Sequence, residues 1–108
     1  MKIDLGQLEF IDEMLRTMAT ETEEAFGCKF VVTSLYRIGD GGVHGALPLR
    51  GLDWRCHYEP FGAFVAAYIN KRWQYDYSRP TKTCCMCHKV GAGALHLHLQ
   101  VHPHTLRR

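Results

Sequence analysis

The most constraining feature of this chain is a regular alternation close to its C-terminal end. Residues 94–101 read ALHLHLQV, in which almost every second residue is apolar. Successive side chains of a β-strand point to opposite faces, so this segment is expected to be a strand with one apolar face. The apolar face carries Leu95, Leu97, Leu99 and Val101. The other face carries His96, His98, Gln100 and His102, a row of imidazoles that a packed core does not require.

Two helices are expected to cover the apolar face of this strand. Residues 4–24 repeat apolar side chains at three- and four-residue spacing, and Gly27 is a natural stop. A second helix is expected to begin near Pro60, because proline suits the first helical turn. Its apolar stripe, expected to face the core, consists of Phe61, Phe64, Val65, Tyr68, Ile69 and Trp73.

The remaining segments complete a small antiparallel sheet. Residues 29–37 have the β-branched and aromatic composition of a strand. Residues 51–56 alternate again, which places Asp53, Arg55 and His57 opposite Leu52, Trp54 and Cys56. Residues 38–48 are rich in glycine, and residues 74–93 are expected to be a long loop. The sequence therefore predicts a single α+β domain over residues 1–108, with a small antiparallel sheet packed against two helices.

Composition excludes several classes of partner. The net charge of +2 is too balanced for a nucleic-acid-binding protein, and the only basic clusters are the pairs at residues 71–72 and 107–108. No run approaches the roughly 18 apolar residues of a membrane span. The first residues read as an amphipathic helix and not as a signal peptide, so a cytoplasmic location is expected.

Histidines and one aspartate from different segments predict a metal site. His44 lies in the glycine-rich loop, Asp53 on the following strand, and His96 with His98 on the last strand. Catalytic zinc sites use three protein ligands of these types and leave a fourth position to water. A solvated polar sheet face is the alternative interpretation. Two histidines two residues apart, held by an apolar strand face, favour metal binding.

Three motifs in order resemble a known family of zinc peptidases. The segments VTSLYR, VHGALPLRGLDWR and LHLHLQV are similar to those of D-alanyl-D-alanine carboxypeptidases and phage L-alanyl-D-glutamate endopeptidases, which share the fold of the Hedgehog signalling domain. The resemblance covers roughly residues 29–102 and suggests a small phage-type member. It implies zinc-dependent hydrolysis of bacterial cell-wall peptides, with no nucleic acid or membrane as partner.

The resemblance implies a role for individual residues. His44, Asp53 and His98 match the three zinc ligands. Arg37 matches the arginine that faces the carbonyl or carboxylate of the substrate, and His96 matches a base or a residue that orients a ligand. When bound, such a metal lowers the pKa of its water from about 16 towards 7.

The chain also departs from the family pattern. Gly42 replaces the serine that usually stands two residues before the first ligand, and the spacer to Asp53 is longer than usual. Leu95 occupies the position where many members carry a glutamate base. The sequence therefore offers His96 as the first candidate for the base and His88 as the second. A metal-binding module of the same fold without hydrolytic activity is the alternative.

The cysteines offer a third possibility. The chain has five, an odd number, which favours free thiols in a reducing compartment. Cys84 and Cys87 nevertheless form a C-x-x-C pair next to His88. With Cys28 or Cys56 they would supply four ligands to a structural zinc in an interaction domain. Near the chain end, His102 and His104 are expected to be solvated.

Overall fold

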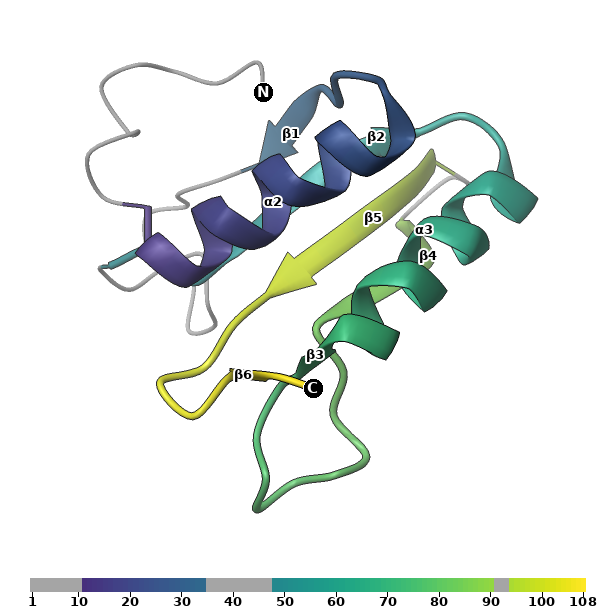
Figure 1. Cartoon of the computed structure of the whole chain (residues 1–108). Helices are drawn as coiled ribbons and strands as arrows, with labels where there is room; N and C mark the ends of the chain where they lie inside the picture. The colour runs from purple at the N-terminus through teal and green to yellow at the C-terminus, as the bar shows by residue number, and fades with distance from the viewer. Residues whose placement is uncertain (1–10, 35–47, 91–93) are drawn as a thin grey trace.

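The computed structural model describes residues 11–34, 48–90 and 94–108 (Figure 1). Within them, two helices and a small sheet confirm the predicted α+β class. The main sheet has the strand order β1-β2-β5-β4 with antiparallel neighbours throughout. Its strands are β1 (Val32–Ser34), β2 (Gly51–Cys56), β4 (Cys85–Val90) and β5 (Ala94–Gln100). A second, two-stranded sheet pairs β3 (Trp73–Gln74) with β6 (Leu106–Arg107).

The first described helix, α2 (Glu13–Phe26), has a defined cap at each end. Asp12 precedes it with non-helical backbone angles, and its Oδ1 accepts hydrogen bonds from the backbone N–H groups of Met14 at 2.8 Å and Leu15 at 3.3 Å. At the other end Gly27 adopts a φ of 66°, the left-handed conformation that glycine accepts without strain. The predicted stop is confirmed. The predicted start at residue 4 is not, because the cap begins the helix at Glu13, and residues 4–10 lie outside the described residues.

The second described helix, α3 (Glu59–Arg72), begins with proline in its first turn, as predicted. Its buried face differs from the predicted aromatic stripe, because Phe61 and Phe64 are 38% and 67% exposed. Their rings contact Phe26 of α2 edge to face, with centroids 5.6 and 6.0 Å apart. The residues that α3 buries are mostly smaller: Gly62, Val65, Ala66 and Ile69. Small side chains allow the helix to approach the sheet closely, and the aromatic rings bridge the two helices instead.

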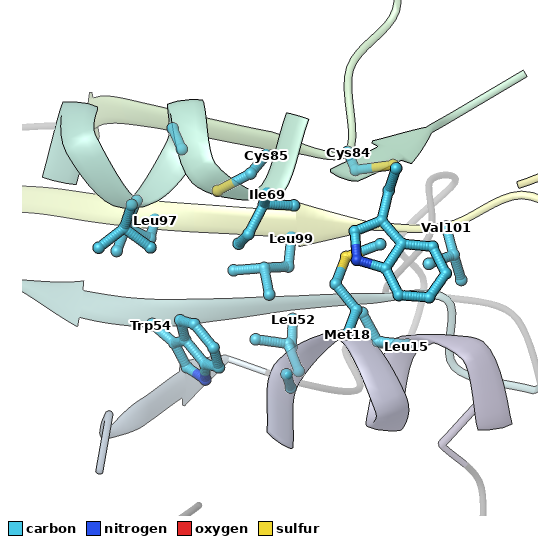
Figure 2. Packing of buried hydrophobic residues seen from close by; sticks show 14 of the residues in the cluster. Leu15, Met18, Leu52, Trp54, Ile69, Cys84, Cys85, Leu97, Leu99 and Val101 are labelled. Atoms are coloured by element: carbon cyan, nitrogen blue, oxygen red, sulfur yellow. The ribbon is translucent and has the colours of Figure 1, made fainter. Parts of the chain in front are cut away.

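The core lies between the two helices and one face of the main sheet (Figure 2). Leu52 and Trp54 of β2 and Leu97 and Leu99 of β5 are fully buried, in agreement with the alternation of both segments. Leu15 and Met18 of α2 and Ile69 of α3 meet them from the helical layer. Each buried aliphatic side chain contributes about 1.5–3 kcal/mol, so this face fixes which side of β2 and β5 remains for polar residues.

Strand β4 corrects the prediction of a long loop over residues 74–93. It pairs with β5 from Cys85 opposite Leu99 to Val90 opposite Ala94. Asn70 of α3 anchors it, because its Oδ1 accepts from the N–H of Cys85 at 2.9 Å and its Nδ2 donates to the carbonyl of Cys85 at 2.8 Å. This edge strand has no strong alternation of its own, so the pairing with β5 decides its conformation.

Strand β1 is shorter than the predicted strand over residues 29–37. The described part contains Val32–Ser34, and residues 35–37 lie outside it. A register shift occurs where Val32 and Ser34 pair with Trp54 and Asp53. Just before the strand, Phe30 stacks on Trp54 with ring centroids 4.3 Å apart.

Candidate functional site

The face of the main sheet opposite the core carries polar side chains from three neighbouring strands. The register places Asp53 of β2 opposite His98 of β5. In the adjacent row Arg55 lies opposite His96, which in turn lies opposite His88 of β4. Directly paired residues share a face of the sheet. Four of the side chains that the sequence singled out therefore lie together on one surface: Asp53, His88, His96 and His98.

Asp53 and His98 are in direct contact across the β2–β5 pair. The Oδ1 atom of Asp53 lies 2.7 Å from Nδ1 of His98, and both side chains are largely buried. On the far side of the imidazole ring, Nε2 lies 3.2 Å from Oε1 of Gln100. Gln100 is fixed in this orientation, because its Nε2 donates to the carbonyl of Thr83 at 2.9 Å. Each ring nitrogen of His98 therefore faces an acceptor oxygen, which orients the ring firmly.

His96 and His88 lie beside this pair. Nδ1 of His96 is 3.2 Å from the hydroxyl of Thr33, and that hydroxyl donates to the backbone carbonyl of Asp53 at 3.3 Å. The ring of His88 is exposed, with its centroid 6.2 Å from that of His98. The sequence placed His88 in a loop, which is wrong. Because it belongs to β4, it presents its ring on the same face as the other two histidines.

Two predicted site residues lie outside the described part of the chain. His44, the first predicted zinc ligand, and Arg37, the predicted substrate contact, both belong to residues 35–47. Their roles stay predictions.

The cysteines of the Cys84–His88 segment lie in or against the core. Cys84 and Cys85 are buried, and Cys87 packs against the core, whereas the neighbouring His88 lies on the opposite face of β4. Burial raises the pKa of the Cys84 thiol to about 12, so the thiolate that zinc requires is disfavoured there. The five cysteines are free, as predicted. In the described ranges no metal-type grouping includes these residues, and the structural zinc at the Cys84–His88 segment stays a prediction.

A different group of possible metal ligands lies at the end of the chain. Asp76, His102 and His104 each offer one ligand atom within 4.8 Å of the others. His104 is exposed, as expected, whereas His102 is partly buried, and both rings approach Asp76. Asp76 lies 26 residues before His102 in the chain, so local spacing gives no indication that they meet. The pattern His-Pro-His was the only signal available in the sequence.

Two surface hollows differ in character. One of about 580 Å³ is largely apolar and includes Arg55, which belongs to the same row of the sheet as His96. Its remaining lining residues are Phe30, Cys56, His57, Tyr58, Pro60, Phe61 and Phe64. The other, of about 600 Å³, lies between α3 and the chain end and is lined by basic groups such as Lys71 and Arg108. The apolar hollow is thus the one that adjoins the histidine-bearing face.

Comparisons with known proteins found no relative for this chain. No family model matches it, and neither the curated proteins nor the solved structures contain a match. The resemblance to the zinc peptidases thus depends on the sequence motifs alone. Of the described helices, neither is long and apolar enough to cross a membrane.

Proposed function

We propose that this protein is a zinc-dependent hydrolase of peptide bonds, with peptides of the bacterial cell wall as its substrate class. The observation that carries the proposal is the 2.7 Å contact between Asp53 and His98 on the polar face of the sheet. A carboxylate and an imidazole are two of the ligands that catalytic zinc uses. His44, the third ligand implied by the motifs, completes the set as a prediction from sequence.

The donor atoms of this pair fit a zinc ion. Gln100 presents a carbonyl oxygen to Nε2 of His98, so Nε2 donates a proton to it. Nδ1 also faces an acceptor, the carboxylate of Asp53, and a zinc ion would take the place of the proton in that contact. Two ligands of a tetrahedral zinc ion lie roughly 3.3 Å apart, given metal–ligand distances of about 2.0–2.1 Å. Small side-chain rotations would widen the 2.7 Å contact to that separation. Gln100 would meanwhile hold the ring, as partners of ligating histidines usually do.

The chain's own residues supply the proton acceptor. When bound, zinc would provide an activated water and polarise the scissile carbonyl. The Thr33 hydroxyl donates its one proton to the carbonyl of Asp53, so it accepts from Nδ1 of His96. In the neutral ring this arrangement puts the lone pair on Nε2, which could take a proton from the nucleophile. His88, exposed on the neighbouring strand, is the second candidate.

The surface beside this site suits a peptide. Arg55 extends from the row of His96 to the apolar hollow of about 580 Å³. An apolar side chain of the substrate could occupy this hollow, and Arg55 could attract a carboxylate of the same peptide. Arg37, as the sequence motifs imply, would hold a second carboxylate or the developing oxyanion.

A metal-binding module without hydrolytic activity is the second candidate, and one observation favours it. Leu95, at the position of the family's glutamate base, packs against the core. No carboxylate therefore reaches the site from that position. Activity would depend on a histidine base, and without one the ion would serve only to bind a ligand.

Zinc stoichiometry tests the metal site. Purified protein is loaded with zinc, desalted and measured by native mass spectrometry, beside the variants His98→Gln and Asp53→Asn. His57→Gln is the matched control for zinc binding, because His57 is exposed and lies beyond the end of β2. We expect each site variant to hold one ion fewer than the wild type and the control. Equal stoichiometry in all four proteins would disprove a zinc ion between Asp53 and His98.

Hydrolysis separates the two candidates. Zinc-loaded protein is incubated with peptides released from bacterial cell walls, and new fragments are identified by liquid chromatography and mass spectrometry. We expect His98→Gln to abolish cleavage with an unchanged circular dichroism spectrum. His96→Gln should keep its zinc and lose about 10²- to 10⁴-fold in kcat, the usual contribution of a general base. Loaded wild-type protein that cleaves none of the peptides would identify the non-hydrolytic module.

A further inference from the structure

We propose that Asp76, His102 and His104 form a second transition-metal site, separate from the polar sheet face, which ties the C-terminal segment to the loop after β3. This site does not depend on the proposed hydrolase function. Neither the sequence motifs nor the resemblance assigns a role to these three residues.

Backbone pairing brings the three residues together. Strands β3 and β6 pair through Trp73 with Arg107 and Gln74 with Leu106. Thr105 fixes the turn just before β6 against the residue after β3, since its hydroxyl accepts from the N–H of His102 at 2.8 Å and donates to the carbonyl of Tyr75 at 2.8 Å. Asp76, just after β3, and the two histidines, just before β6, therefore lie close together at one end of this small sheet.

The separations of the ligand atoms match those around a metal ion. Nδ1 of His104 lies 3.4 Å from Oδ1 of Asp76, and Nδ1 of His102 lies 3.7 Å from Oδ2. Ligands of tetrahedral zinc are roughly 3.3 Å apart, so little movement is needed to place an ion between them. The distance of 3.7 Å is too long for a hydrogen bond, so that His102–Asp76 contact does not already satisfy the pair.

The carboxylate of Asp76 is ionised and held in place. Asp76 is only 2% exposed, and its burial by itself disfavours the charged form. Hydrogen bonds outweigh this effect and hold its pKa far below the usual range: Oδ1 accepts from the N–H and hydroxyl of Ser78, and Oδ2 accepts from Nε of Arg79. Ligating carboxylates are commonly fixed by such partners. Oδ1 accepts two hydrogen bonds from Ser78, whereas Oδ2 accepts only one, from the partly exposed Arg79, so Oδ2 is the oxygen assigned to the ion.

Both imidazole rings are positioned by aromatic neighbours. The ring of His104 stacks on Tyr77 with centroids 5.0 Å apart, and that of His102 lies 5.7 Å from Tyr75. Nδ1 of His102 accepts from the N–H of His104 at 3.1 Å, and an ion bound at Nδ1 would replace this hydrogen bond. The side chains of His102 and His104 are 28% and 47% exposed, which gives an ion access and leaves a position for water.

The donor set selects the class of ion. Two imidazole nitrogens and one carboxylate oxygen favour zinc, cobalt, nickel or copper over magnesium and calcium, which prefer oxygen ligands. Protons compete with metal ions for imidazole nitrogens, so the affinity for the ion is expected to fall as the pH is lowered.

The experiment uses the full chain with the first site removed. His98→Gln is titrated with Zn²⁺ and with Co²⁺ as a spectroscopic probe, beside His98→Gln/His104→Gln and the control His98→Gln/His57→Gln. We expect His98→Gln and the control to bind one ion, with a cobalt absorption band and a raised Tm. The variant that lacks His104 should bind at least tenfold more weakly and show no Tm increase.

Two results would overturn this proposal. One is the absence of zinc binding by His98→Gln. The other is equal affinity with and without His104. If the variant without His104 folds poorly, nuclear magnetic resonance of His98→Gln alone decides the question. Zinc must then shift the ring signals of His102 and His104 in that protein. Zinc binding by Asp53 and His98 is tested separately, by comparing the wild type with His98→Gln. Either proposal can therefore fail while the other holds.

Discussion

Replacement of Gly62 by alanine is expected to destabilise the protein even though alanine is the better helix former. Gly62 lies in the first turns of α3, where the helix approaches the sheet. A Cβ atom at this position would lie 2.5 Å from Sγ of Cys87 and 2.8 Å from Sγ of Cys56. Contacts between non-bonded heavy atoms are favourable at about 3.5–4.0 Å, so the new methyl group overlaps both sulfur atoms by roughly 1 Å.

The two opposing effects can be compared in size. Overpacking of this kind costs about 1–3 kcal/mol, and two simultaneous overlaps place Gly62→Ala near the upper end. The higher helix propensity of alanine offsets up to about 1 kcal/mol of this loss in the free energy of unfolding. We therefore expect the free energy of unfolding to fall by about 1–2 kcal/mol. In a Cys56→Ala/Cys87→Ala background both sulfur atoms are gone, and the same substitution should stabilise by up to about 1 kcal/mol.

Urea unfolding of the four proteins measures this change of sign. The fluorescence of Trp54 and Trp73 reports the transition, since both are buried in the core. The double-mutant cycle then gives a coupling energy of about 2–3 kcal/mol between Gly62 and the two thiols. Equal effects of Gly62→Ala in the two backgrounds, or stabilisation of the wild type, would refute the close packing of α3 on β2 and β4.

Three further predictions concern the helix cap, the thiols and the buried carboxylate. Asp12→Ala should lower the free energy of unfolding by about 0.5–2 kcal/mol in urea titrations, and Asp12→Asn should restore most of it, because an amide oxygen can accept the same bonds. Cys28 is exposed and should react first with a thiol reagent under native conditions, whereas Cys84, with its pKa raised to about 12 by burial, should react only on unfolding; a fast phase that survives Cys28→Ser would contradict this. The pKa of Asp76 is lower in the folded state, so its stabilisation is present above the ordinary aspartate pKa and is lost as pH falls below it. The Tm difference between wild type and Asp76→Asn should accordingly narrow from pH 7 to pH 3. A constant difference would show that the charge of Asp76 is not the cause of its stabilising effect.

Much of the fold was predictable because it depends on local patterns. The alternation in residues 94–101 assigned Leu97 and Leu99 to the core, and both are fully buried. Gly27 and Pro60 marked a helix end and a helix start for reasons of backbone geometry alone. The aromatic stripe of α3 was misassigned because periodicity cannot tell the sheet from a neighbouring helix: Phe61 and Phe64 meet Phe26 instead.

The candidate site was predictable in its residue types and only partly in its arrangement. The sequence grouped Asp53 with His98 and placed them on polar faces, because side-chain direction in a strand follows from a period of two. Their contact at 2.7 Å requires that β2 and β5 be neighbours in one particular register. The separation of 45 residues between them leaves no local pattern that sets this register.

The sequence by itself determined which faces of the strands are apolar, where two helix ends fall, and which polar residue types line the exposed face of the sheet. The tertiary structure alone decided that β4 is a strand, that His88 joins the histidines of β5, and that Asp76 meets His102 and His104. The physical reason is the range of the forces involved. Side-chain periodicity and backbone propensity act over a few residues. Strand pairing and burial join segments that are far apart in the chain, and no local pattern indicates which segments meet.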